Sequence, residues 1–297
     1  STVTPSKCTN KAQTFRGCTE VEPISIGSRL IYVQKRSQTV RDMAYSFETD
    51  SYDGMDLTLL AKHLLRGKTI VDAAYMQDPD SRLYFVRSDG EIICLAYIND
   101  QKVYAWSHII TKGKYLSVCT VAAEETDEVY TAVERNGKTY IEKMGTDKDS
   151  QDPKDYIMTD CSKVLTFDEP DDAASVDWIT GTVSVLADGK FLEDVEIKEE
   201  TVTLPTKVSY MIIGYPYRMT IELPNVEIQA QNGTMQGRYK NVRTVSLRLL
   251  HTLGGSIGNG VGRNDTIKYE ELSDQKIRLF CAFHKIEFHI KFCLQDC

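Results

Sequence analysis

The sequence lacks any apolar run that approaches the ~20 residues of a membrane-spanning helix, so we expect no membrane insertion. It also shows no basic stretch followed by an apolar one of the kind that directs secretion. We therefore expect the eight cysteines to be reduced thiols in a protein that assembles in the cytosol. Hydrophobic residues nevertheless make up 41% of the 297 residues, which allows a proper core and argues against wholesale disorder.

A complete catalytic or cofactor-binding motif is also missing. Gly258, Gly260 and Gly262 do not form a dinucleotide fingerprint, because the third glycine follows the second too closely and no helical pattern comes after it, so a flexible loop is favoured. Five metal-binding side chains cluster near the C-terminus: Cys281, His284, His289, Cys293 and Cys297. Their spacing fits no common zinc site. The sequence therefore predicts no enzymatic activity, no cofactor and no metal.

The clearest pattern lies in residues 55–144, where a short amphipathic helix precedes closely spaced strands. Five apolar residues recur at helical spacing: Leu57, Leu60, Ala61, Leu64 and Leu65. With Gly67 behind them in a left-handed conformation, they predict a helix near residues 56–66. Seven strand-like runs follow, at residues 69–76, 82–87, 91–98, 103–110, 115–123, 129–135 and 138–144. Trp106 is predicted to be largely buried in the fourth run.

The spacing of these runs, near ten residues per strand with turn residues between, is typical of an antiparallel meander. The first four runs together have the length of a four-stranded propeller blade, although no repeated Trp-Asp signature accompanies them. The predicted fold class is mainly β: an antiparallel meander with propeller-like blades, a second β domain, and one short helix near residues 56–66.

Composition predicts five segments along the chain. Residues 1–22 are irregular, residues 23–145 form the propeller-like domain, and residues 146–172 form an acidic linker with nine acids against three bases. Residues 173–263 form the second β domain. Residues 264–297 form a C-terminal segment that ends in a half-buried strand pattern.

A set of residues in fixed order carries a resemblance. Its members are Asp56-Leu57-Thr58, Ala61, His63-Leu64, Ile70, Asp72, Ala74-Tyr75, Pro79, Val86-Arg87, Asp89-Gly90, Leu95, Tyr97, Ala105-Trp106 and His108. The later stretches Gly214-Tyr215-Pro216-Tyr217 and Gly233-Thr234-Met235-Gln236-Gly237-Arg238 continue it. This order is similar to the tail hub, nozzle or stabilisation proteins of short-tailed bacteriophages and prophages. The similarity covers residues 23–253, whereas residues 264–297 depart from the family pattern, as in a truncated or frameshifted copy.

The resemblance implies a structural virion protein and not an enzyme. Family members form a ring, commonly a hexamer, below the portal and its adaptor ring in the tail. The ring extends the channel, stabilises the packaged genome, conducts double-stranded DNA during ejection, and offers sites for tail spike or needle proteins. A net charge of −8 suits a conduit through which DNA slides. The alternative is a receptor- or glycan-binding tail module, and a weaker one is a glycan-cleaving tail enzyme.

Charge is distributed unevenly in a way that bears on assembly. Residues 231–263 contain five bases and no acid. We expect four of these bases, Arg238, Lys240, Arg243 and Arg248, to be assembly contacts with an acidic neighbour. That neighbour is either the acidic linker of the next subunit or the adaptor ring. The alternative is a strand whose bases face solvent.

Overall fold

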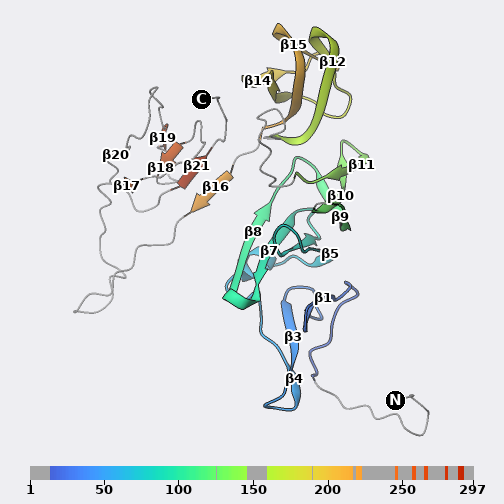
Figure 1. The fold of residues 1–297 in the computed structure, drawn as a ribbon, viewed down its shortest axis with the longest axis vertical. Coiled ribbons are helices and arrows are strands. Elements are labelled where there is room, and N and C mark those ends of the chain that lie inside the picture. Colours follow the sequence, from blue (N-terminus) through green and yellow to red (C-terminus); the bar gives the residue numbers. More distant parts are fainter. Residues whose placement is uncertain are drawn as a thin grey trace. The chain divides into compact units, whose positions relative to one another are not determined.

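The computed structural model describes residues 14–145 apart from residue 125, residues 159–216 apart from residue 189, and the backbone of six short strands between residues 219 and 290. The chain divides into two compact units, Ser1–Asp147 and Lys148–Cys297. Several antiparallel sheets and one short α-helix make up the described part, so the predicted mainly β class is confirmed (Figure 1).

Unit 1 contains three consecutive antiparallel sheets. Sheet 1 consists of β1 (Ile24–Ile26), β2 (Arg29–Val33), β3 (Val40–Ser46) and β4 (Ser51–Asp53). Sheet 2 consists of β5 (Ile70–Met76), β6 (Arg82–Arg87), β7 (Ile92–Ile98) and β8 (Val103–Ile109), with the 3-10 turn η1 (Asn99–Gln101) before β8. Sheet 3 consists of β9 (Lys114–Ala122), β10 (Asp127–Arg135) and β11 (Lys138–Lys143). Neighbours in each sheet are neighbours in the chain, which is the predicted meander.

Sheet 2 buries both of its faces. One set of alternating residues of β6 and β7 packs with sheet 1: Leu83, Phe85, Ile93, Leu95 and Tyr97. The other set packs with sheet 3: Tyr84, Val86, Ile92 and Cys94. Successive side chains of a strand point to opposite faces. A strand covered on both faces is therefore apolar at nearly every position, and β6 and β7 are.

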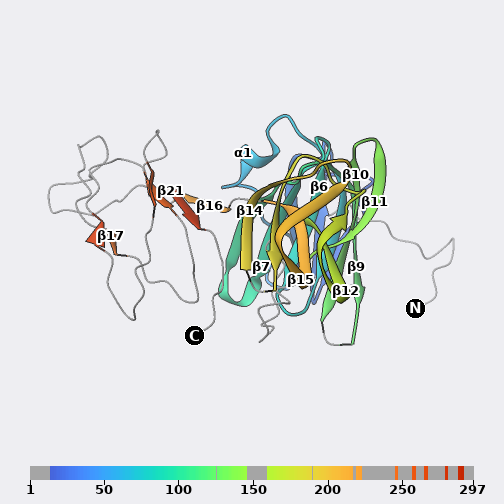
Figure 2. The ribbon, with the colours of Figure 1, turned by 90° about the horizontal axis from the view of Figure 1, so that it is seen from above.

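The helix is shorter than predicted. The α-helix α1 spans only Lys62–Leu65, and it follows a series of turns that begins after Asp56 (Figure 2). The Asp56 carboxylate accepts the Thr58 N–H at 2.9 Å, and the Leu57 carbonyl accepts the Trp106 indole N–H at 2.9 Å, so this carbonyl does not bond within a helix. None of the helices in the described part of the chain is long and apolar enough to cross a membrane.

The packing of this segment matches the prediction in part. Leu57, Ala61 and Leu65 are buried, and Gly67 has the expected positive φ of 71°. Leu60, which was predicted to pack, is 94% exposed, so that prediction is wrong. The tight turns rotate Leu60 away from the side that carries the three buried residues.

Trp106 was predicted to be largely buried, and it packs, partly buried, against the core that contains Ile70, Phe85 and Leu95. It lies on β8, an edge strand, so part of its ring stays open to solvent. It is paired with Leu95 on β7, and its ring centroid is 5.7 Å from that of Phe85.

Unit 2 contains sheet 4, whose long strands bend. Its strands are β12 (Asp160–Ser175), β13 (Thr182–Ala187), β14 (Lys190–Glu196) and β15 (Thr201–Tyr215), in the order β12-β15-β13-β14. The register of β12 and β15 shifts on both sides of Asp171, with Pro170 and Pro205 close to the shifts. Both ends of β12 and β15 contribute to one core, and Figures 1 and 2 show the curvature of these strands.

β12 corrects the predicted acidic linker. Residues 160–172 were assigned to that linker but form most of β12, while residues 146–158 lie outside the described residues. Leu165 and Phe167 pack on the core of sheet 4, and the strand pairs with β15. The acidic residues near the bend are exposed, which explains why composition alone indicated a solvated linker.

Six short strands follow: β16 (Met219–Glu222), β17 (Val245–Ser246), β18 (Ser256–Gly258), β19 (Asn264–Thr266), β20 (Arg278–Leu279) and β21 (Glu287–Ile290). β18 lies in the stretch predicted to be a flexible glycine-rich loop, so that prediction is wrong for its three residues, because they pair with β19 and β21. Gly260 and Gly262 lie outside the described residues. β21 matches the strand predicted near the C-terminus, and β16 and β18 both pair with it.

Candidate functional site

The four bases proposed as assembly contacts, Arg238, Lys240, Arg243 and Arg248, lie outside the described residues, so their prediction stays a prediction. Part of the proposed acidic counterpart is described. Asp168, Glu169 and Asp171 are exposed on β12.

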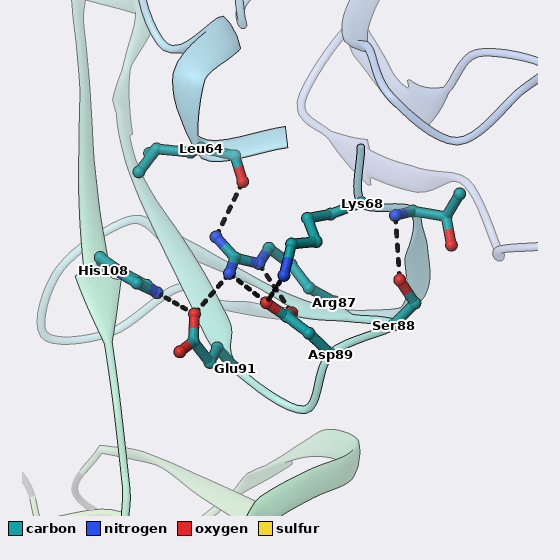
Figure 3. A network of polar contacts seen from close by, with 8 residues as sticks. Leu64, Lys68, Arg87, Ser88, Asp89, Glu91 and His108 are labelled. Carbon is teal, nitrogen blue, oxygen red and sulfur yellow. Dashed lines mark hydrogen bonds and ion pairs between the residues drawn. The ribbon is translucent and has the colours of Figure 1, made fainter. Parts of the chain in front are cut away.

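The densest polar cluster of the described chain surrounds Arg87, the last residue of β6 (Figure 3). Its guanidinium donates from Nε to Asp89 Oδ1 at 3.0 Å and from Nη2 to Asp89 Oδ2 at 2.5 Å. Nη2 also pairs with the Glu91 carboxylate, and Nη1 donates to the Leu64 carbonyl at 2.8 Å. His108 Nε2 lies 2.6 Å from the same Glu91 carboxylate. One arginine therefore joins the β6–β7 turn to α1 and, through Glu91, to β8.

The electrostatics of this cluster favour a closed structural clamp. The hydrogen bonds to Asp89 raise the pKa of Arg87, although burial opposes the shift. The hydrogen bond from Arg87 lowers the pKa of Asp89 well below its usual range, and Lys68 adds to this with a contact of 2.5 Å. The Arg87 side chain is only 6% exposed. Both carboxylates pair with cations, so the cluster holds the β6–β7 turn in place.

Arg135 repeats this arrangement in sheet 3. It ends β10, and its Nε and Nη2 contact the two carboxylate oxygens of Glu142 at 2.7 Å each. Its Nη1 donates to the Lys112 carbonyl at 2.9 Å, 23 residues upstream, just as Arg87 donates to a carbonyl 23 residues upstream. Each arginine ends the second strand of its sheet, next to a glycine-containing turn. No repeat was predicted here from the sequence. An arginine stands shortly before Asp89-Gly90 and directly before Asn136-Gly137, and this shared feature could have indicated one.

The described residues offer no metal centre. No group of three or more His, Cys, Asp or Glu side chains among them is arranged to hold an ion. Cys94 is a buried free thiol, and burial raises its pKa to about 11, so it is chemically inert. Cys119 lies on β9 and is an exposed free thiol. The five candidate zinc ligands lie outside the residues whose side chains are described, so the absence of a metal there stays a prediction.

Exposed aromatic residues gather on the β3–β4 hairpin. Tyr45, Phe47 and Tyr52 are 50%, 89% and 48% exposed, and the rings of Tyr45 and Tyr52 meet edge to face with centroids 5.5 Å apart. This surface was not predicted from the sequence, because strand patterns do not reveal which aromatic residues stay outside a core. The sequence feature that could have indicated it is the mixture of aromatic and acidic residues, without any base, between residues 44 and 53.

No family model and no curated protein matches the sequence. The likeness to phage tail proteins therefore rests on the residues of this chain alone.

Proposed function

We propose that this protein is a structural component of a bacteriophage tail. In this role its copies form a ring, commonly of six subunits, that extends the portal channel, stabilises the packaged DNA and conducts it during ejection. Its partners are other copies, adaptor or portal ring proteins, and tail spike or needle proteins, and it has no catalytic part. It resides in the virion tail after assembly in the host cytoplasm.

The observation that carries this proposal is the position, in the structure, of residues that carry the resemblance to phage tail proteins. Val86-Arg87 and Asp89-Gly90 build the Arg87 clamp, and Leu57 and Trp106 share the hydrogen bond that ties the turn before α1 to sheet 2. These contacts fix the geometry between consecutive elements of unit 1. A resemblance concentrated on such contacts supports a shared architecture, and the tail function follows from that likeness.

The physical character of the chain also supports this role. A ring needs modules with surfaces left over for neighbours, and it needs no catalytic group. Sheets 1 and 3 each pack one face against sheet 2, so the opposite face of each does not contact sheet 2. A net charge of −8 disfavours tight binding to the DNA that slides through the channel.

Native mass spectrometry and negative-stain electron microscopy of the purified chain test the proposal, alone and with adaptor ring proteins. We expect closed rings of one subunit number, stabilised by the adaptor ring. A chain that stays monomeric in both conditions would contradict the proposal. Specific binding on a glycan array by such a monomer would favour the receptor- or glycan-binding alternative.

A further inference from the structure

We infer that the β3–β4 hairpin, residues 44–53, is the docking surface for the basic segment of a neighbouring copy, residues 236–248. This inference rests on the proposed function, because that function requires contacts between copies. It replaces the predicted acidic linker, of which residues 160–172 lie in β12, as the partner of the basic segment.

The hairpin presents exposed aromatic side chains. Phe47 lies at its turn and is 89% exposed, and the rings of Tyr45 and Tyr52 cover one face of the hairpin. Figure 1 shows the β3–β4 hairpin extending away from β1. Exposed apolar clusters of this kind mark interaction sites, whereas single exposed apolar residues do not.

The base of the hairpin is held firmly, so the aromatic residues are presented in a fixed geometry. Asp42 is buried on β3, pairs with Arg29, and accepts the Met55 N–H at 2.7 Å. Gly54 packs so closely on the Asp42 carbonyl that any side chain there would overlap it. A preorganised surface loses less entropy when a partner binds.

The charge of the hairpin selects a basic partner. Residues 44–53 contain Glu48, Asp50 and Asp53 and no base. None of these three carboxylates takes part in an ion pair within the described part of the chain. Carboxylates beside exposed tyrosine rings suit arginine, whose guanidinium pairs with the former and stacks on the latter.

The chain itself carries a segment of this chemistry. Arg238, Lys240, Arg243 and Arg248 fall in residues 231–263, which contain no acid. The acids exposed on β12 are a poorer match, because Val164 is the only large apolar residue exposed among the described residues of unit 2. The hairpin combines carboxylates outside the ion pairs of the described residues with exposed aromatic rings; Asp50 accepts the Tyr45 hydroxyl and Asp53 accepts the Gly54 N–H, each at 2.7 Å.

Peptide binding tests the pairing directly. The probe is a labelled synthetic peptide of residues 235–250, followed by fluorescence anisotropy at low salt. It is titrated with a reference chain that carries R238E/K240E/R248E, so that the hairpin is not already occupied by the segment of a neighbouring copy. We expect saturable binding that weakens at least tenfold when E48K/D50K/D53K is added to the reference chain, and several-fold with Phe47→Ser. The matched control D168K/E169K/D171K, which reverses three exposed acids of β12, should bind the peptide like the reference chain. Absent binding to the reference chain, or equal loss in hairpin and control variants, would overturn the inference.

Mixing of charge-reversed chains tests whether the pairing joins two copies. E48K/D50K/D53K and R238E/K240E/R248E should each fail to assemble alone at low salt, and an equimolar mixture should assemble because each chain then meets an opposite charge on its neighbour. Pairing within one chain would not be restored by mixing, so unrestored assembly overturns the inference. If hairpin variants form rings like the parent, the pairing is wrong and the ring proposal stands. If the reference chain binds the peptide but the unmodified chain never oligomerises, the ring proposal fails instead.

Discussion

Sheet 2 and sheet 4 bury apolar surface in two different ways. Sheet 2 lies between two other sheets, so both faces of β6 and β7 are covered. Sheet 4 bends around a single core, to which distant parts of the same long strands contribute, such as Ala174 and Leu165 of β12. A stacked sheet depends on neighbouring sheets to bury its apolar faces, whereas the strands of a bent sheet bury one another's apolar residues.

The two solutions demand different sequences. Stacking requires apolar residues at successive positions, as in β6, where five of six residues are buried. Bending requires irregularities that let the strand turn, and the register shifts around Asp171 and the nearby Pro205 provide them. Stacking also leaves one face each of sheets 1 and 3 that is not packed against sheet 2.

The largest expected effect is the loss of a side chain from the core between sheets 1 and 2. Phe85 is 1% exposed, and Phe85→Ala should destabilise unit 1 by about 3–5 kcal/mol, because the cavity cannot be filled by neighbours in two rigid sheets. The matched control is Phe47→Ala, since Phe47 is 89% exposed and its loss should change stability by less than about 0.5 kcal/mol.

Hydrogen-exchange mass spectrometry of the full chain measures both variants, because it reports on each unit separately. A similar loss of protection for the two variants would show that the hairpin belongs to the folding core. That result would also weaken its assignment as a docking surface.

A smaller effect is expected from the clamp that joins sheet 2 to α1. Arg87→Ala should cost about 2–3 kcal/mol, because the Leu64 carbonyl loses its donor while Asp89 keeps only Lys68 and Glu91 keeps only His108. The cost falls below that of a fully buried pair, since the Asp89 and Glu91 side chains are 21% and 30% exposed.

Arg87→Lys is the informative control, because it keeps the charge but loses the fork of donors. Denaturant unfolding and exchange of the peptides around residues 57–66 provide the measurement. We expect the lysine variant to recover only part of the stability. Full recovery would show that charge alone, without the bond to the Leu64 carbonyl, holds the clamp.

Local signals predicted the meander well, and long-range contacts account for the errors. The strand predicted at residues 82–87 is observed as Arg82–Arg87, because its pattern and its turns are set by neighbouring residues. The helix was predicted too long because the Leu57 carbonyl bonds to Trp106, 49 residues away. No local pattern reports such a partner.

The predictions of the linker and of the functional site failed for the same reason. β12 was not predicted because its acidic residues are typical of a solvated linker. Its pairing with β15, which joins residues as far apart in the sequence as Asp160 and Tyr215, leaves no local pattern. The Arg87 clamp was visible only as an arginine near a turn, since the carbonyl that it binds lies 23 residues upstream. Which aromatic residues remain outside a core likewise depends on the assembled sheets.

A third prediction concerns the bent sheet. Gly214 lies on β15, where an added Cβ would come within 2.6 Å of Thr159 Oγ1 and 2.7 Å of the Asp160 carbonyl oxygen. Gly214→Ala should therefore push β12 away and cost about 1–3 kcal/mol. The control Val164→Ala changes a side chain that is 44% exposed on the same sheet, and it should have little effect. Exchange protection of β12 and β15 measures the difference. Equal protection in the two variants would mean that the start of β12 can move without loss.

The smallest expected effect concerns Tyr97, on the sheet 1 side of sheet 2. Its hydroxyl is buried without a hydrogen-bond partner among the described residues, so Tyr97→Phe should be neutral or stabilise unit 1 by about 1 kcal/mol.

Burial also raises the pKa of Tyr97 to about 12 from its usual 10.0. The unfolded chain therefore loses this proton first as the pH rises above 10, and the parent loses stability until the folded pKa is reached. The advantage of Tyr97→Phe over the parent should then grow by about 1 kcal/mol between pH 9 and pH 11, as measured by urea unfolding at each pH. A constant difference across that range would mean that the Tyr97 hydroxyl is solvated in the folded protein and that the core between sheets 1 and 2 admits water.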